Sequence, residues 1–246
     1  MRQREVKKLA HGPSKVKSEL AMNSASQLDR VGEFERTWVD PRNTRFELPP
    51  VDVNRVLAEH YLTNQPLTFT RAMLWDTEVR KAWKPDRYIP SVVREGSARA
   101  WGRRSAADGT ESFVRSSQQR LWLEPAEYGL VLEQVHLDHT QQKVTFIGAA
   151  ELPDPDRNIL RAGARRPLFH VEHSVDGDES RPLNRWRIVH LTDRSERKLV
   201  ERFTRIASDV WLPEFIEIYI WSDLNIKLTR RDISVGEIPE VSHEVA

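Results

Sequence analysis

The segment from Leu168 to Thr192, which reads LFHVEHSVDGDESRPLNRWRIVHLT, decides the fold because it predicts two neighbouring strands. Its first part alternates, so that one side of the pleat carries Phe169, Val171, His173 and Val175. A turn signal, Asp176-Gly177-Asp178, then separates the two strands. A histidine therefore lies on a side that is otherwise apolar.

The second strand of this segment brings another histidine to an apolar side. Its alternation places two arginines on one face and, on the other, Trp186, Ile188 and His190. A buried imidazole needs a hydrogen-bond partner or a function, because burying a polar group without compensation costs roughly 1–3 kcal/mol. We therefore expect His173 and His190 to face a pocket.

Composition limits the class of protein. The chain has 246 residues with 8 Trp and 8 Phe, enough for one large domain with tails. Its 38 Lys+Arg and 37 Asp+Glu leave a net charge of +1, which gives no electrostatic signal for a nucleic-acid partner. The absence of cysteine excludes disulfides and thiol catalysis and suits a reducing cytosol. No apolar run approaches the roughly 20 residues of a membrane span, so a cytoplasmic location is expected.

The chain divides into three parts by composition. Residues 1–45 are polar and are expected to be mobile, and residues 229–246 form a short tail. The working domain is expected to span residues 46–228. Within it, we predict a helix over 51–61, a strand over 66–74 and a helical piece over 78–83.

A series of short strands precedes a change of period near the C-terminus. The predicted strands cover residues 97–103, 112–123, 128–138, 143–152, 168–175 and 184–192. From Ser195, helical spacing relates Leu199, Phe203, Ile206 and Val210, and a second helical piece is predicted over 213–224. This order is typical of an α+β fold, with an antiparallel sheet where the connections are hairpins.

This order resembles the START and polyketide-cyclase-like (SRPBCC, helix-grip) superfamily. The resemblance covers about residues 66–228 and includes the segments Met73-Leu74-Trp75-Asp76 and Ala82-Trp83-Lys84-Pro85, where such proteins carry small helices. It implies a curved antiparallel sheet of about six or seven strands around a C-terminal helix. It also implies an internal cavity for a hydrophobic or aromatic molecule, used for carriage or catalysis.

A third inward polar group is predicted in one hairpin. If Leu137 lies opposite Val144, then Glu133 lies opposite Gly148, which has no side chain to fill the space. A carboxylate beside such a vacancy would suit a ligand. The alternative is that the opposite parity, which contains His136, faces the core and leaves Glu133 in water.

A metal site is the alternative use of the same residues. Glu133, His173 and His190 could hold zinc or another divalent metal, joined by Glu214 or Glu217 from the closing helix. This set distantly resembles zinc-dependent carbon–carbon hydrolases of acylated phloroglucinols. Those enzymes place a histidine on the last helix, which this chain lacks there. Motifs of Rossmann, P-loop, serine-hydrolase and zincin enzymes are absent.

Three functions remain open. The first is a metal-free cyclase, hydratase or decarboxylase acting on an aromatic or polyketide-like compound, with His173 or His190 moving protons and Glu133 orienting the substrate. The others are a metal-dependent hydrolase or lyase and a noncatalytic lipid or metabolite carrier. A homodimer is left open. The expected lining of the cavity is Phe69, Met73, Val135, Phe146, Phe169, Trp186 and Ile188.

Overall fold

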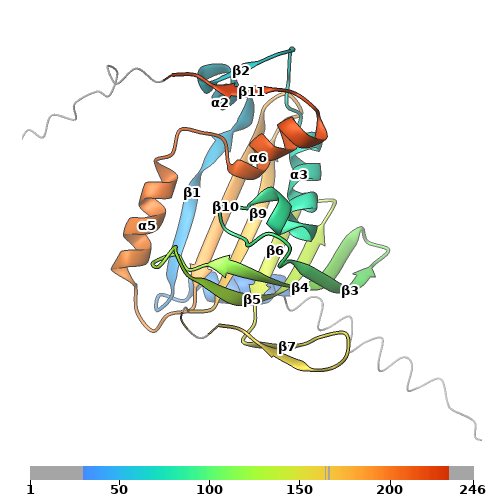
Figure 1. Ribbon diagram of the computed structural model, residues 1–246. Coiled ribbons are helices and arrows are strands. Elements are labelled where there is room, and N and C mark those ends of the chain that lie inside the picture. The colour runs from blue at the N-terminus through green and yellow to red at the C-terminus, as the bar shows by residue number, and fades with distance from the viewer. Residues whose placement is uncertain (1–29, 164, 166, 233–246) are drawn as a thin grey trace, which may run out of the picture.

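The computed structural model describes residues 30–163, 165 and 167–232, which form an α+β fold built on one large sheet. The sheet has seven antiparallel strands in the order β1-β10-β9-β6-β5-β4-β3, and two small two-stranded sheets pair β11 with β2 and β7 with β8 (Figure 1). The strands are β1 (Thr44–Asp52), β2 (Tyr61–Thr63), β3 (Arg99–Ser105), β4 (Thr110–Arg120), β5 (Tyr128–Asp138), β6 (Lys143–Gly148), β7 (Glu151–Pro153), β8 (Ile159–Arg161), β9 (Phe169–Gly177), β10 (Pro182–His190) and β11 (Leu228–Arg230).

The helices that follow β1 cover one face of this sheet. They are α2 (Val53–His60), α3 (Arg71–Trp83), α4 (Pro85–Tyr88), α5 (Arg197–Ala207), α6 (Glu214–Ile218) and the π-helical turn η1 (Tyr219–Asp223). The α5 helix lies along β1, whereas α3 and α6 lie over the middle of the sheet (Figure 1). This is the helix-grip arrangement that the sequence predicts, with seven strands around the C-terminal helical segments.

The predicted hairpins are confirmed in position and register. The β9 and β10 strands pair directly, so that Trp186 lies opposite His173. In the β5–β6 hairpin, Glu133 lies opposite Gly148, as expected, and is buried. Both hairpins have short connections, which make their register a local property of the sequence.

One predicted element is wrong at the start of the domain, and one strand there was not predicted. The segment over 66–74 is not a strand, because Thr70 caps α3 by accepting a hydrogen bond from the backbone N–H of Met73. The first strand is instead β1, which contains Pro49-Pro50. The register of β1 with β10 shifts between Leu48 and Val51, which is how an edge strand accommodates prolines.

The described fold includes elements on both sides of residues 46–228. Residues 30–39 are helical, and Phe34 in this helix is fully buried and clusters with Ile147 and Val189 on the sheet. At the other end, β11 pairs with β2, so the fold extends beyond residue 228. The expected mobility of residues 1–29 and the expected tail over 233–246 concern parts that lie outside the described residues.

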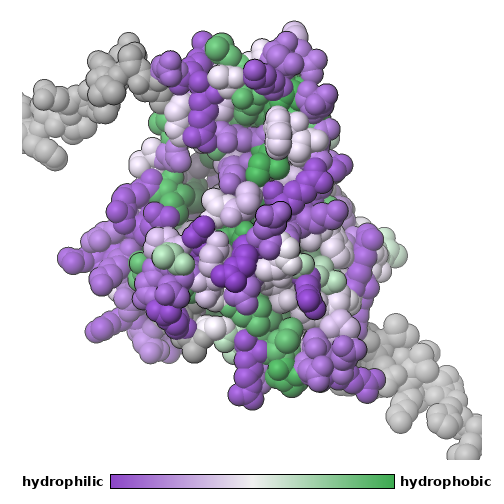
Figure 2. Space-filling model, in the orientation of Figure 1, coloured by the Kyte–Doolittle hydropathy of each residue, from purple (hydrophilic) through white to green (hydrophobic). Residues whose placement is uncertain are grey.

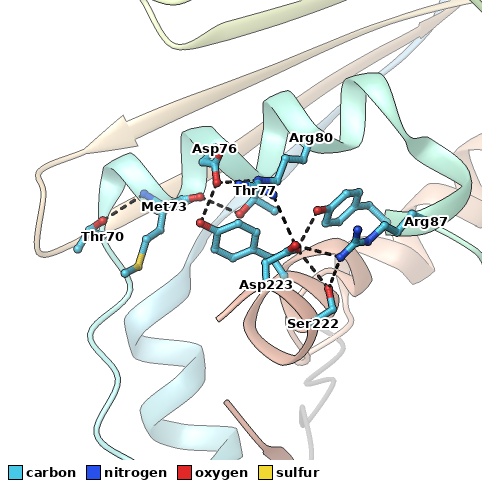
Figure 3. A network of polar contacts seen from close by, with 10 residues as sticks. Thr70, Met73, Asp76, Thr77, Arg80, Arg87, Ser222 and Asp223 are labelled. Atoms are coloured by element: carbon cyan, nitrogen blue, oxygen red, sulfur yellow. Dashed lines mark hydrogen bonds and ion pairs between the residues drawn. The ribbon is translucent and has the colours of Figure 1, made fainter. Parts of the chain in front are cut away.

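A polar network fixes η1 against α3 (Figure 3). Asp76 accepts hydrogen bonds from Arg80 Nε at 2.8 Å and from the Tyr219 hydroxyl at 2.9 Å. Asp223 accepts from the Tyr88 hydroxyl at 2.7 Å and from Arg87 at 3.0 Å. These contacts hold the C-terminal end of the α6–η1 segment in place over the sheet.

Candidate functional site

A cavity of about 340 Å³ lies between the β1–β10 edge of the sheet and the helices α5 and α6. Its apolar wall consists of Leu48, Pro49, Val51, Ile89, Val92, Trp122, Trp186, Ile206, Ala207, Trp211, Leu212, Pro213 and Phe215. Its polar wall consists of Ser91, Asn184, Arg202, Asp209, Glu214 and Arg230. On the face of the molecule that carries α5 and α6, hydrophilic residues dominate, and hydrophobic ones appear in small groups (Figure 2).

Secondary structure and hydrogen bonds position this wall. Trp186 projects from β10 toward the helices and stacks on Phe215 of α6, with ring centroids 5.8 Å apart. The segment before α6 is held by the Tyr61 hydroxyl, which accepts a hydrogen bond from the Leu212 backbone N–H at 2.9 Å. Glu214 accepts hydrogen bonds from the backbone N–H and the hydroxyl of Ser91. The stacked rings of Trp186 and Phe215 therefore form a fixed part of the wall.

Four buried polar atoms belong to residues of this wall and have no hydrogen-bond partner within the described part of the chain. They are Trp122 Nε1, Asn184 Oδ1, Trp186 Nε1 and Arg202 Nε. Buried side-chain polar atoms in folded proteins usually have a partner. Each of these four atoms is closed to a water-sized probe, so none of them is exposed to the cavity.

A buried ionic cluster lies behind the cavity wall. Lys81 Nζ of α3 lies 2.5 Å from Glu78 Oε2 and 2.5 Å from His173 Nδ1. Asn184 donates from Nδ2 to Glu78 Oε1 at 2.7 Å. The ammonium also lies 3.7 Å from the centroid of the Phe215 ring, a cation–π contact. Glu78, Lys81 and His173 do not line the cavity, from which Asn184 and Phe215 separate them.

Burial determines the ionisation of this cluster. It lowers the pKa of Lys81 to about 8, although Glu78 acts in the opposite direction. Burial alone would raise the pKa of Glu78, but the charges of Lys81 and His173 and their hydrogen bonds together outweigh it, and the pKa is about 2. Burial and the charge of Lys81 lower the pKa of His173 to about 4. At neutral pH, His173 is thus uncharged and accepts a hydrogen bond from the Lys81 ammonium at Nδ1. The 3.0 Å distance between His173 Nδ1 and the Glu78 carboxylate then arises because both atoms contact the same Lys81 ammonium.

The cluster predicts a loss of stability in acid. His173 and Glu78 have pKa values below their ordinary values of 6.5 and 4.5, so the unfolded chain binds more protons than the folded protein. Their contribution is complete above pH 6.5 and decreases as the pH falls. The contribution of His173 to the free energy of unfolding is lost between pH 6.5 and about 4, and that of Glu78 between pH 4.5 and about 2. Each group contributes at most about 1.4 kcal/mol per pH unit within its window.

Urea unfolding between pH 7 and pH 4.5 measures this effect. We expect His173→Gln to flatten the dependence of unfolding free energy on pH in this range. His139→Gln is the control, because the His139 side chain is 40% exposed. An unchanged slope in His173→Gln would show that His173 is not held uncharged by its surroundings.

The three predicted catalytic residues do not meet. Glu133 and His190 share a cross-strand row but are three strands apart, a separation of about 14 Å. His173 lies opposite Trp186, four residues along β10 from His190, or about 13 Å. None of the three lines the cavity. The structure therefore does not bring Glu133, His173 and His190 together at this cavity.

Glu133 and His190 have other surroundings. Glu133 Oε2 accepts a hydrogen bond from Arg115 Nε at 2.7 Å, and both side chains are buried. The predicted vacancy at Gly148 is absent, since an added Cβ there would lie 2.4 Å from the carbonyl oxygen of Phe169. His190 is fully buried, with ring centroids 5.6 Å from Phe169 and 5.5 Å from Phe203.

The alternative metal ligands are also dispersed. Glu214 lines the cavity, whereas Glu217 accepts hydrogen bonds from Tyr61 and Arg230 on another surface. Within residues 30–163, 165 and 167–232, no group of three His, Asp or Glu side chains is placed to hold a metal ion. The donor set proposed from the sequence is thus not assembled.

Of the seven predicted lining residues, all within the described part of the chain, Trp186 is the one that lines the cavity. Phe69, Val135, Phe146, Phe169 and Ile188 are buried in the core, and Met73 packs against it. Sequence patterns did not predict that Trp122, Trp211 and Arg202 line the cavity. Trp122 and Trp211 lie outside regular elements, where periodicity gives no signal. Arg202 and Ile206 are four residues apart, which could have revealed a second inward face of α5.

The strand order defines a helix-grip fold, with this cavity between the sheet and the helices α5 and α6. No protein-family model matches the chain, and no curated protein matches it significantly. Among solved structures, the Zhui aromatase/cyclase from Streptomyces sp. R1128 is similar with a TM-score of 0.45 and 10% identity, over 73% of this chain and 95% of that chain.

Two further structures are similar at the same level. Ara h 8.0201 gives a TM-score of 0.42 and 9% identity, over 72% of this chain and 97% of that chain. The di-domain ARO/CYC StfQ from the steffimycin biosynthetic pathway gives a TM-score of 0.36 and 15% identity, over 61% of this chain and 42% of that chain. Because these TM-scores are low, the fold assignment rests on the strand order. None of the helices in the described part of the chain is long and apolar enough to cross a membrane.

Proposed function

We propose that this protein binds a planar, largely apolar small molecule in the cavity between β10, α5 and α6. The observation that carries the proposal is the convergence of three indole rings, Trp122, Trp186 and Trp211, from separate segments of the chain. A volume of about 340 Å³ is at the lower end of the range for ligand pockets, roughly 300–1,000 Å³. It suits a molecule of two or three fused rings.

Binding without catalysis is the form of this function that the wall favours. A cyclase, hydratase or decarboxylase needs an acid or base within hydrogen-bond reach of its substrate. The two carboxylates of the wall accept local hydrogen bonds, Glu214 from Ser91 and Asp209 from the Trp211 backbone N–H. His173 lies behind the wall. Carriage of an aromatic metabolite therefore agrees best with the arrangement.

A ligand panel tests the proposal. We expect two- and three-ring aromatic compounds to raise the melting temperature and to quench tryptophan emission, because apolar area dominates binding in such a cavity. Sugar phosphates should have no effect, since no glycine-rich phosphate cradle is present in the sequence. Stabilisation by phosphorylated metabolites, without stabilisation by aromatic compounds, would contradict the proposal.

Two matched variants locate the binding site. Trp186→Phe keeps an aromatic wall but should remove a large part of the quenching. Trp101→Phe is the control, because Trp101 lies on β3 at the far edge of the sheet and should leave the ligand-induced change intact. Equal quenching in both variants would place the ligand elsewhere.

A further inference from the structure

One arginine of the cavity wall has no partner for its charge. The side chain of Arg202 makes no hydrogen bond, ion pair or aromatic-ring contact with any residue that the structure describes, although it is only partly exposed. Charged side chains that are removed from water are usually paired, because desolvation of an unpaired charge costs free energy. The other described arginines without such side-chain contacts are all exposed to water, and they are Arg55, Arg99, Arg104, Arg157, Arg194 and Arg205.

The α5 helix turns Arg202 toward the cavity. Leu199 and Phe203 are the buried residues of this helix, whereas Arg205 is exposed on its outer side. Arg202 lies four residues before Ile206, and residues at this spacing share one side of a helix. Both Arg202 and Ile206 line the cavity. This side of α5 therefore faces the cavity and not the open solvent.

The guanidinium of Arg202 is closed to water at one end and open at the other. Its Nε has less than 1 Å² of accessible surface and no hydrogen-bond partner. The two terminal nitrogens also lack a partner among the described residues, but they are not closed to water in this way. They therefore remain available as donors. These two nitrogens form the fork with which arginine binds a carboxylate through parallel hydrogen bonds.

The other charged side chains of the wall have partners. Arg230 forms an ion pair with Glu217. Glu214 and Asp209 each accept a hydrogen bond from a neighbouring group of the protein, and neither forms an ion pair with Arg202. Within the described part of the chain, Arg202 is thus the charge of this wall that lacks an opposite charge.

We infer that Arg202 is an anion subsite of the cavity and that the ligand is an aromatic acid, whose carboxylate pairs with the Arg202 guanidinium while its rings contact the apolar wall. This inference rests on the proposed function and names the polar group of its ligand. The two oxygens of a carboxylate are spaced to accept both hydrogen bonds of the guanidinium fork. An ion pair that is partly shielded from water is stronger than one on an open surface, because the effective dielectric constant is lower.

Three naphthalene derivatives of similar size test the subsite by isothermal titration calorimetry at pH 7. Naphthalene-2-carboxylate is an anion, naphthalene-2-carboxamide is its neutral counterpart, and 2-naphthylmethylammonium is a cation. We expect the carboxylate to bind about tenfold more tightly than the carboxamide, because its hydrogen bonds to the guanidinium are charge-assisted at both ends. The cation should bind more weakly than both. Equal affinities of the carboxylate and the carboxamide would contradict the subsite.

Substitutions assign the preference to Arg202. Arg202→Met keeps the aliphatic stem without the charge, so it should abolish the preference for the carboxylate and leave carboxamide affinity within about twofold. Arg202→Lys keeps a cation without the fork and should retain part of the preference. Arg205→Met is the matched control, because it removes an unpaired charge from the exposed side of the same helix. An unchanged preference in Arg202→Met, or the same loss in Arg205→Met, would overturn the inference.

The outcomes separate this inference from the function on which it rests. If the carboxamide and the carboxylate bind equally well, and Arg202→Met binds both as the unmodified protein does, the cavity holds aromatic compounds but Arg202 does not select their charge. If none of the three probes binds, the proposed function fails and the inference fails with it. A circular-dichroism spectrum and a melting curve of each variant confirm that it is folded before titration.

Discussion

Lys81→Met is expected to destabilise the protein by about 3–5 kcal/mol, the usual effect of removing one partner of a buried ion pair. Lys81 and Glu78 are almost completely buried and lie 2.5 Å apart. Methionine fills a similar volume but leaves the Glu78 carboxylate without its cation in a site closed to water. The cation–π contact with Phe215 is lost as well.

Chemical denaturation at pH 7 measures this change in the free energy of unfolding. Lys84→Met is the control, since Lys84 is exposed just after α3, and should change stability by less than about 0.5 kcal/mol. The double variant Glu78→Met with Lys81→Met removes both charges and should recover part of the loss. A loss below about 1 kcal/mol for Lys81→Met would indicate that water reaches the cluster.

Phe203→Ala should cost about 3–5 kcal/mol because it leaves a cavity in the seam between α5 and the sheet. Phe203 is 1% exposed, and its ring centroid lies 4.6 Å from that of Phe46 on β1. The same ring supports His190 and Trp122. Its removal thus affects the strand edge and the cavity wall together.

Val200→Ala provides the comparison, because Val200 lies on the same helix and is 37% exposed. It should cost less than about 1 kcal/mol in the same denaturation experiment. Similar losses for the two variants would mean that α5 does not contribute its Phe203 face to the core. The sequence also placed Val210 on this buried face, but α5 ends at Ala207 and Val210 is 44% exposed.

Sequence patterns predicted those parts of the fold whose contacts are local. The alternation of apolar residues predicted β9 and β10. The predicted pairing of Glu133 with Gly148 in the β5–β6 hairpin is also observed. The β1 strand was missed because Pro49-Pro50 interrupts its alternation, and its partner β10 is more than a hundred residues away. Pairing over such a distance leaves no signature in neighbouring residues.

The site was harder to predict for a related reason. Glu78 and Lys81 have the i,i+3 spacing of an ordinary exposed ion pair on a helix, and nothing local shows that this face of α3 lies on the sheet. The inward direction of His173 was correct, but its partners come from α3. Inward direction alone could not show which of the buried polar groups share a site.

The proline interruption in β1 also affects how copies of the protein can meet. The free edges of the large sheet are β1 and β3. Pro49-Pro50 and the register shift disturb the hydrogen-bonding edge of β1, and β3 has its own irregularity between Trp101 and Arg104, with exposed arginines along it. Broken pairing and charge are devices that prevent strands of separate molecules from joining into one continuous sheet. Both borders are thus protected against edge-to-edge aggregation, and self-association would need another surface.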